Sequence, residues 1–424
     1  MRRLLALLRN CAAVRPLASG LIAATLVLLV RKPQALLLPQ FWAEDACVFF
    51  REALLLGPSS LLHTYSGYLH LLPRLIALAG TLLPFELVPL FYNLSALAVL
   101  LAVAAHFLGS RFEGRHSVWL LLVSVLVFHD GECFLCLTNL QWVVAPYLIL
   151  FCFRRPPATR IELLLDSLVV VLLGLSGPFV IFCLPFFLIR AIRSRSALLR
   201  IWCGVAGLTA AVQLYFLGSR GEQLGGSSFT SFHALFDLLV ARFARCFLLP
   251  LASADYLGRS FQIGVFAFLL CYLVVLLAGR TEHRFFYGAV LGFAVMETAA
   301  ALSKLAPIVE ALSSFGRGER YFYFSYVLLG WVLVQALADR RKAVARTACL
   351  LLALSLGVSL AHFRAPDWPD LDWRGYAKLL RTHDHFIVPV NPPGWGLEVD
   401  RTAPDGMWLE ALGPGSFRRS AARE

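Results

Sequence analysis

Two adjacent carboxylates, Glu44 and Asp45, follow the first apolar segment of the chain, beside the aromatic pair Phe41 and Trp42. A carboxylate close to a bilayer is costly unless it meets water, a cation or a substrate, so it indicates a functional site. Such a group can take the proton of a hydroxyl as a general base. A pair of them with water molecules can also hold Mg²⁺ or Mn²⁺. We expect Asp45 to be the base or a metal ligand and Glu44 to be its partner.

Polar side chains at the start of two later apolar segments could also meet a ligand. Asn139 and Gln141 are amides, which need hydrogen-bond partners when they are buried. Trp142 beside them suits either stacking on a sugar ring or anchoring at the membrane interface. Arg317 lies between two glycines and Arg320 opens the following apolar segment, where both suit either a phosphate group or ordinary snorkelling to the lipid headgroups.

The composition is that of an integral membrane protein. Of the 424 residues, 59% are hydrophobic and 15% are charged, and the mean hydropathy is +0.73. Soluble domains are about 45–50% apolar and about 25% charged. The net charge of +12 could suit nucleic acid, but in so apolar a chain arginine mainly sets the membrane topology. We therefore expect an all-α polytopic protein that binds a lipid bilayer and no nucleic acid.

Hydropathy predicts eleven membrane spans, the first of which serves as a retained signal anchor. Their expected ranges are 12–30, 85–108, 117–129, 139–153, 161–175, 178–190, 199–217, 261–278, 285–302, 321–337 and 343–361. The apolar stretch 69–84 is interpreted as lying in the membrane interface, because an additional span there would reverse the sides of everything after it. The short segments on the side of the N-terminus are then rich in arginine, which indicates the cytoplasm. Glu44 and Asp45 then face the exterior.

Residues 161–190 are predicted to form two short helices joined by an outward-facing turn. Gly177 permits a tight reversal of the chain, and Pro178 cannot donate a hydrogen bond to the preceding helix. Two helices also place the arginines at both ends of this segment on the cytoplasmic side, whereas one kinked span would separate them.

The chain divides into a membrane part and a small exterior tail. The expected divisions are residues 1–361, with exterior loops at 31–84, 218–260 and 303–320, and a tail at 362–424. The tail is shorter than a typical independent domain, so we expect it to cap the exterior face. Its proline- and glycine-rich segment 388–396 predicts a rigid loop and not the core of a sheet.

Most of the ten cysteines lie in apolar segments, where cysteine behaves as a small hydrophobic residue. Cys133 and Cys136 form one C-x2-C pair without a second ligand pair, which argues against a zinc site. A disulfide between the two stays open, because it depends on the compartment that this segment faces.

The segments FWAED, TNLQW, LSGPF and NPPGW together resemble an uncharacterised bacterial group within the GT-C superfamily of membrane glycosyltransferases. Members have an inside N-terminus, one span and a large exterior loop with an acidic motif and interfacial helices, and later a pair of short helices. Here the motif corresponds to Glu44 and Asp45, the interfacial part to 52–84 and the pair to 161–190. The order Glu-Asp departs from the family pattern and leaves the base unassigned. The absence of a WWDYG motif argues against transfer to asparagine of a protein.

The resemblance implies transfer of a sugar from a polyprenyl-phosphate donor to a glycan or lipid acceptor, at the exterior face of a bacterial inner membrane. Arg74 and Arg320 would bind the phosphate, and Tyr68, Asn139 and Gln141 would shape the sugar pocket. A divalent cation, Mg²⁺ or Mn²⁺ on Glu44 and Asp45, could assist the leaving phosphate. The full set of expected substrate-binding residues is Tyr68, His70, Arg74, Asn139, Gln141, Trp142, Lys304, Arg317, Arg320 and Tyr321.

Three other functions share part of this pattern. A polymerase or ligase of lipid-linked glycans would carry paired arginines on a large late exterior loop. A transporter or flippase of lipid-linked saccharides would need ionisable residues within the spans. The main residues of that kind are Asp166 and Glu297, and we expect Glu297 to pair with a base such as Lys304. A structural subunit would tolerate replacement of both Glu44 and Asp45.

Overall fold

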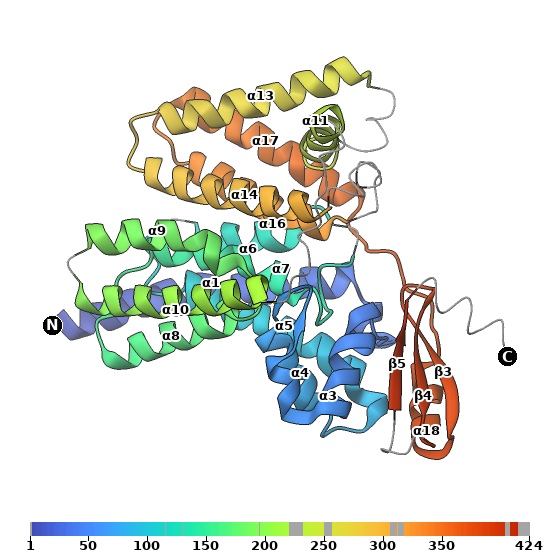
Figure 1. Cartoon of the computed structure of the whole chain (residues 1–424). Coiled ribbons are helices and arrows are strands. Elements are labelled where there is room, and N and C mark those ends of the chain that lie inside the picture. Colours follow the sequence, from blue (N-terminus) through green and yellow to red (C-terminus); the bar gives the residue numbers. More distant parts are fainter. Residues whose placement is uncertain are drawn as a thin grey trace.

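The structure is a computed structural model of the whole chain (Figure 1). It describes residues 2–114, 116–129, 131–194, 196–219, 232–249, 257–305, 312, 318–402 and 408–413. For residues 2–15, 304, 305, 381 and 408 only the backbone is described. Most of the predicted exterior loops 218–260 and 303–320 therefore lie outside the described residues.

The protein is mostly helical, at 71%, and helices cover all eleven ranges that hydropathy predicts as spans. These helices are α1 (Arg2–Arg31), α5 (Val88–Leu108), α6 (Ser117–Leu126), α7 (Leu140–Val144) with η4 (Ala145–Phe153), α8 (Arg160–Gly174), α9 (Phe179–Arg193), α10 (Ala197–Ser219), α13 (Arg259–Ala278), α14 (Arg284–Leu305), α16 (Arg320–Ala336) and α17 (Lys342–Ala361). The boundaries agree to within a few residues for most of them, because long apolar runs between Gly, Pro and Arg punctuation define these helices.

Five of the helical segments described are long and apolar enough to cross a membrane. They are Phe85–Leu108, Ala197–Ser219, Arg259–Ala278, Arg284–Ser303 and Lys342–Ala361. Others are apolar but shorter, among them Pro16–Arg31, Ser117–Leu126 and Leu140–Phe153. The structure thus supports the membrane class of the protein.

The segment 69–84 contains α4 (Leu71–Gly80), which has 10 residues. A helix of that length rises about 15 Å, roughly half of the hydrocarbon thickness of a bilayer. This helix is therefore too short to cross a bilayer by itself. The rest of the first loop forms short elements: α2 (Gln34–Leu37), η1 (Asp45–Phe50), α3 (Arg51–Leu56), η2 (Gly57–Leu62), the hairpin β1 (Thr64–Tyr65) and β2 (Tyr68–Leu69), and η3 (Phe85–Leu87).

The predicted hairpin of short helices is present as α8 and α9, which are 15 residues long each. Four residues, 175–178, separate them. Gly177 has a φ of +154°, and a Cβ there would lie 2.8 Å from Oε1 of Gln141. The turn therefore needs glycine both for its backbone angle and for its close approach to α7.

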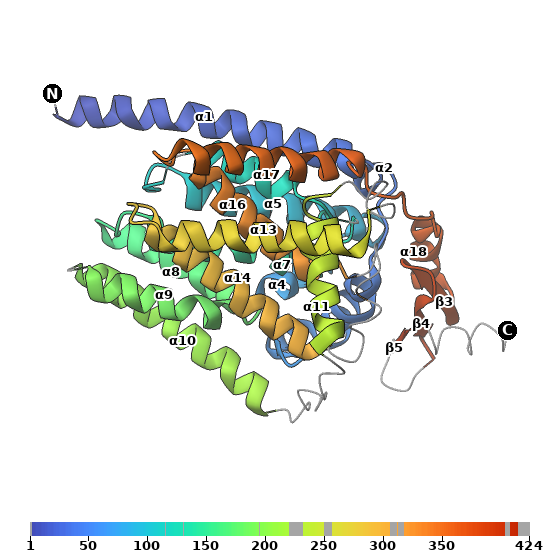
Figure 2. The same ribbon diagram turned by 90° about the horizontal axis from the view of Figure 1, so that it is seen from above.

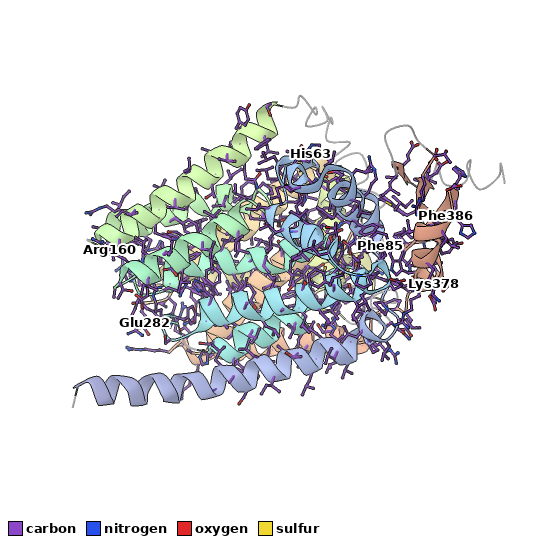
Figure 3. All side chains as sticks on the ribbon, turned by 90° about the horizontal axis from the view of Figure 1, so that it is seen from below. His63, Phe85, Arg160, Glu282, Lys378 and Phe386 are labelled. Atoms are coloured by element: carbon purple, nitrogen blue, oxygen red, sulfur yellow. The ribbon has the colours of Figure 1, made fainter. Side chains whose placement is uncertain are left out.

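The helices run side by side, so that the chain has two distinct ends (Figures 1 and 2). The N-terminus lies at one end, and the C-terminal strands lie at the other. Figure 3 places Arg160 and Glu282 at the first end and His63, Lys378 and Phe386 at the second. Arg160 and Glu282 thus lie at the same end of the helices as the N-terminus.

Helix α16 forms the centre of the helical part, and every residue from Phe322 to Ala336 is buried. A helix that is apolar on all sides belongs in a core. Near its start, the fully buried Glu319 binds Arg242 of η5 (Ala241–Arg245), with 2.7 Å between Oε1 and Nη1. Arg242 also donates to the carbonyl of Leu312. This pair joins α11 (Phe232–Val240) and η5 to the central helix.

The expectation that 388–396 forms a loop and no sheet is wrong. β3 (His385–Val390) and β4 (Trp395–Asp400) pair antiparallel, and β5 (Trp408–Leu412) extends the sheet in the order β3-β4-β5. Pro389 lies in β3, an edge strand, where a missing N–H is tolerated. Only 391–394, between β3 and β4, form the expected turn.

The tail packs on the loop that follows α1. Trp42 forms a bridge with Asn391, and Nε of Arg51 donates to the carbonyl of Leu409 at 2.8 Å. Nε1 of Trp373, the first residue of α18 (Trp373–Thr382), donates to the carbonyl of Phe85 at 2.9 Å. The tail thus contacts the backbone on either side of the Glu44-Asp45 motif.

Candidate functional site

Glu44 lies just before η1 and is 7% exposed. The hydroxyl of Tyr65 donates to its Oε1 at 3.0 Å, while Oε2 is buried and has no hydrogen-bond partner. Tyr65 belongs to the β1–β2 hairpin, so the first loop folds back to orient its own acid. One oxygen of Glu44 is thereby held and the other is left for a ligand.

Asp45 has a different environment from its neighbour. Its Oδ1 accepts from the backbone N–H of Thr138 at 2.7 Å and from the Thr138 hydroxyl, and Oδ2 accepts from the N–H of Leu137 at 3.2 Å. Burial raises the pKa of Asp45 to about 6, although these hydrogen bonds act in the opposite direction and Glu44 adds to the rise. Asp45 is 1% exposed and joins the first loop to the segment before α7.

A cavity opens beside Glu44, where five parts of the chain meet. Its lining consists of Glu44, Tyr65, Ser66, Tyr68, Thr138, Asn139, Gln141, Trp142, Pro178, Phe179, Phe182, Glu297, Ala300, Ala301, Arg320 and Tyr321. Seven of the residues expected from the sequence are among them: Glu44, Tyr68, Asn139, Gln141, Trp142, Arg320 and Tyr321. The structure thus brings together residues up to 277 positions apart in the sequence.

His70 stands behind the cavity wall rather than in it. Its ring stacks on Tyr68, with 4.6 Å between centroids. Its Nδ1 donates to the Tyr68 carbonyl at 3.2 Å, which leaves Nε2 as the acceptor for Nε2 of Gln141, also at 3.2 Å. His70 therefore positions two wall residues.

Arg74 is buried away from the cavity. Its Nη1 lies 2.8 Å from Oε2 of Glu52, and its guanidinium lies 5.5 Å from the ring centroid of Phe49. These contacts give Arg74 a role inside the first loop, so the structure does not place it where it could bind a phosphate in the cavity. Arg317 and the side chain of Lys304 lie outside the described residues.

Arg320 carries a positive charge at the wall of the cavity. Its Nη1 lies 3.1 Å from Oε2 of Glu132, and its Nη2 donates to the Tyr321 hydroxyl at 3.3 Å. Arg320 is the first residue of α16, so its charge lies at the N-terminal end of the central helix.

Three important positions were not found from the sequence. Tyr65 and Thr138 hold the two carboxylates in place. Gln213 of α10, fully buried, accepts from the N–H of Leu69 and donates to the carbonyls of Leu69, Gly174 and Gly177. A glutamine in the middle of an apolar helix was the available signal for it, because a buried amide requires partners.

Glu297 was expected to pair with a base, but neither of its oxygens has a hydrogen-bond partner. It is 2% exposed and lines the cavity from α14. Asp166, the other acid within the predicted spans, is fully engaged, at 2.8 Å from Nη2 of Arg111 and 3.1 Å from Nη1 of Arg154 and Nε2 of His106. Glu297 is therefore a buried acid without a hydrogen-bond partner, whereas Asp166 is paired with three neighbouring side chains.

Cys133 and Cys136 are both buried and form no disulfide with each other. Sγ of Cys136 donates to the carbonyl of Glu132 at 3.0 Å. In the part of the chain described, no group of three or more His, Cys, Asp or Glu residues is arranged to hold a metal ion. Since the oxygens of Asp45 are engaged, only Glu44 of the expected pair faces the cavity.

No protein-family model, curated protein or solved structure matches this chain. The function proposed for it accordingly depends on the chemistry of its cavity.

Proposed function

We propose that this protein is an integral-membrane glycosyltransferase that moves a sugar from a polyprenyl-phosphate donor to a glycan or lipid acceptor of the cell envelope. The observation that carries the proposal is the free Oε2 of Glu44, which lies beside a cavity with aromatic walls and an arginine. A base, a surface for a sugar ring and a cation for phosphate are the groups that such a transfer needs.

Glu44 is the proposed general base. Its carboxylate takes the proton of the acceptor hydroxyl, the hydroxyl oxygen attacks the anomeric carbon, and the bond from that carbon to the phosphate oxygen breaks. The electron pair of this bond leaves with the phosphate, and the configuration at the anomeric carbon inverts. Asp45 is unsuited to this role because three donors already engage its oxygens.

Arg320 is the proposed partner of the leaving phosphate. A guanidinium presents several donors in a plane and binds phosphate well, and positive charge where the anion develops lowers the barrier. Phosphate would compete with Glu132 for this side chain, so Glu132 holds Arg320 in position until the donor arrives.

The sugar ring would lie between the aromatic side chains of Tyr68, Trp142 and Tyr321. Gln141 contributes an Oε1 that is buried without a partner, and a sugar hydroxyl would satisfy it. Trp142 packs edge-on against both Phe179 and Tyr321, at 5.1 and 5.3 Å between centroids. These contacts keep its ring in one orientation.

The cavity would face the exterior of a bacterial inner membrane, with eleven spans and a cytoplasmic N-terminus. Support comes from the arginine-rich segments near the N-terminal end of the helices and from the position of the tail at the other end (Figure 3). Asp166 gives no support to a transporter, since its charge is met by three neighbouring side chains.

The test is transfer of labelled sugar from a polyprenyl-phosphate donor pool in membranes that contain the wild type, Glu44→Gln or Asp384→Asn. Asp384 is exposed in the tail and serves as the matched control. We expect transfer by the wild type and the control, and a loss of about 10²–10⁴-fold in Glu44→Gln at equal abundance. Transfer that is absent in the wild type for every donor, or unchanged in Glu44→Gln, contradicts the proposal.

A further inference from the structure

Three residues that line the cavity have buried oxygen atoms without hydrogen-bond partners. Oε2 of Glu44, Oε1 of Gln141 and both oxygens of Glu297 are buried without hydrogen-bond partners. The amide oxygen of Gln141 is an acceptor, and the carboxyl oxygens of Glu44 and Glu297 are acceptors when these groups are ionised. Among the described side chains that line the cavity, no donor is left unpaired in the same way. A ligand that completes this wall must therefore present donors.

Glu297 is the most costly of these groups. It is 2% exposed and lies within an apolar helix, whose residues Ala300 and Ala301 also line the cavity. A buried ionisable group without a partner costs several kcal/mol. Such a residue inside a membrane helix is a functional candidate by default. Its position in the cavity indicates that the ligand supplies the missing partner.

The charges on the wall are also unbalanced. Glu44 and Glu297 are two acidic groups, each negative when it is ionised, and Arg320 is already paired with Glu132 at 3.1 Å. A polyprenyl-phosphate donor would add a further negative charge. A neutral sugar would leave this excess of negative charge uncompensated, whereas a positively charged group on the ligand would neutralise part of it.

The aromatic walls indicate which kind of cation fits. Six aromatic residues line the cavity, namely Tyr65, Tyr68, Trp142, Phe179, Phe182 and Tyr321. The faces of such rings attract organic ammonium groups. Mg²⁺ prefers an octahedron of oxygens and keeps several water molecules, and the described residues offer no group of three acidic, His or Cys ligands. The wall therefore suits an amine better than a metal ion.

We propose that the cavity binds a protonated amino group at Glu297, so that its ligand is an amino-substituted sugar. Oε1 of Gln141 and the aromatic side chains contact the rest of the sugar ring. Glu44 remains available for the hydroxyl of the acceptor substrate. That the amine sits on a transferred sugar rests on the proposed function; the ammonium site itself does not. Glu297 is thus a specificity-determining residue.

The experiment measures binding without transfer. Glucose and its 2-, 3-, 4- and 6-amino-deoxy analogues are titrated by saturation-transfer NMR into the purified full chain in lipid nanodiscs, near pH 6.5. We expect at least one amino sugar to bind at least ten-fold more tightly than glucose. This preference should fall by at least ten-fold in Glu297→Gln and persist in Glu282→Gln, an exposed control at the opposite end of the helices. Equal binding of all five sugars, or a preference that Glu297→Gln leaves intact, overturns the inference.

A second measurement needs no variant. N-acetylation of the preferred amino sugar removes its charge, and we expect a loss of binding of at least ten-fold to the wild type. Equal binding of both forms overturns the inference. Displacement of the amino sugar by Mn²⁺ through Glu297 also overturns it, in favour of a metal site. If wild-type transfer is absent while the amine preference holds, the proposed function fails alone; if transfer occurs without the preference, this inference fails alone.

Discussion

Replacement of Asp45 by asparagine should remove a specific pH dependence of folding stability. Asp45 is 1% exposed, and burial raises its pKa from 3.8 to about 6. The folded protein therefore holds this proton more tightly than the unfolded chain does. The stabilisation that results is fully present below the unfolded pKa and is lost as the pH rises through the folded pKa. The relevant window runs from about pH 4 to about pH 7.

The expected size of the effect follows from the two pKa values. Their difference, from 3.8 to about 6, corresponds to about 3 kcal/mol in the free energy of unfolding. Asparagine resembles the protonated carboxyl in shape and does not titrate. Relative to the wild type, Asp45→Asn should therefore gain about 3 kcal/mol of stability between pH 4 and pH 7.5.

The assay is denaturant unfolding in detergent micelles, followed by tryptophan fluorescence, at several pH values. Other acids titrate in the same window, so the useful quantity is the difference in unfolding free energy between variant and wild type at each pH. Asp384→Asn, in the exposed part of the tail, provides the matched control and should give a flat difference. A flat difference for Asp45→Asn, or one that falls as the pH rises, would refute the account of Asp45 as a desolvated structural acid.

Three further substitutions test other parts of the structure by the same unfolding measurement. Arg242→Met should cost about 3–5 kcal/mol because it leaves Glu319 buried and unpaired, and adding Glu319→Leu should recover most of the loss; no recovery would contradict the pairing. Gln213→Leu should cost about 2–4 kcal/mol through its lost hydrogen bonds and also lower transfer, because it misplaces the first loop; full stability would contradict this. Thr138→Val should cost about 1–3 kcal/mol and raise the pKa of Asp45 further, so the pH-dependent loss should move to higher pH and not to lower pH.

The helices could be predicted from the sequence because each is marked by a local pattern of apolar residues. Apolar runs bounded by arginine, glycine and proline define most of the helices from α5 to α17, and the longest of these runs have about 20 residues. The short helices α8 and α9 were accessible because Gly177 and Pro178 mark the turn between them. In contrast, β3 was missed because Pro389 argued against a strand, and only the pairing with β4 shows that β3 is an edge.

Part of the candidate site could be predicted from the sequence, for a different reason. Polar residues in an apolar chain are few, so Glu44, Gln141 and Arg320 were natural candidates. Which of two adjacent acids faces the cavity depends on Thr138, a residue 93 positions from Asp45 in the sequence. Local patterns contain no information about such a contact.

The most direct test of the central claim is single-turnover release of polyprenyl phosphate by the purified protein in nanodiscs, with a polyprenyl-phosphate sugar bound and acceptor added. The account predicts that Glu44→Gln slows release by at least about 10²-fold without weakening donor binding, whereas Asp45→Asn, if folded, retains most of the rate. Equal rates for Glu44→Gln and the wild type would contradict the assignment of Glu44 as the base. A large loss confined to Asp45→Asn would return that role to Asp45.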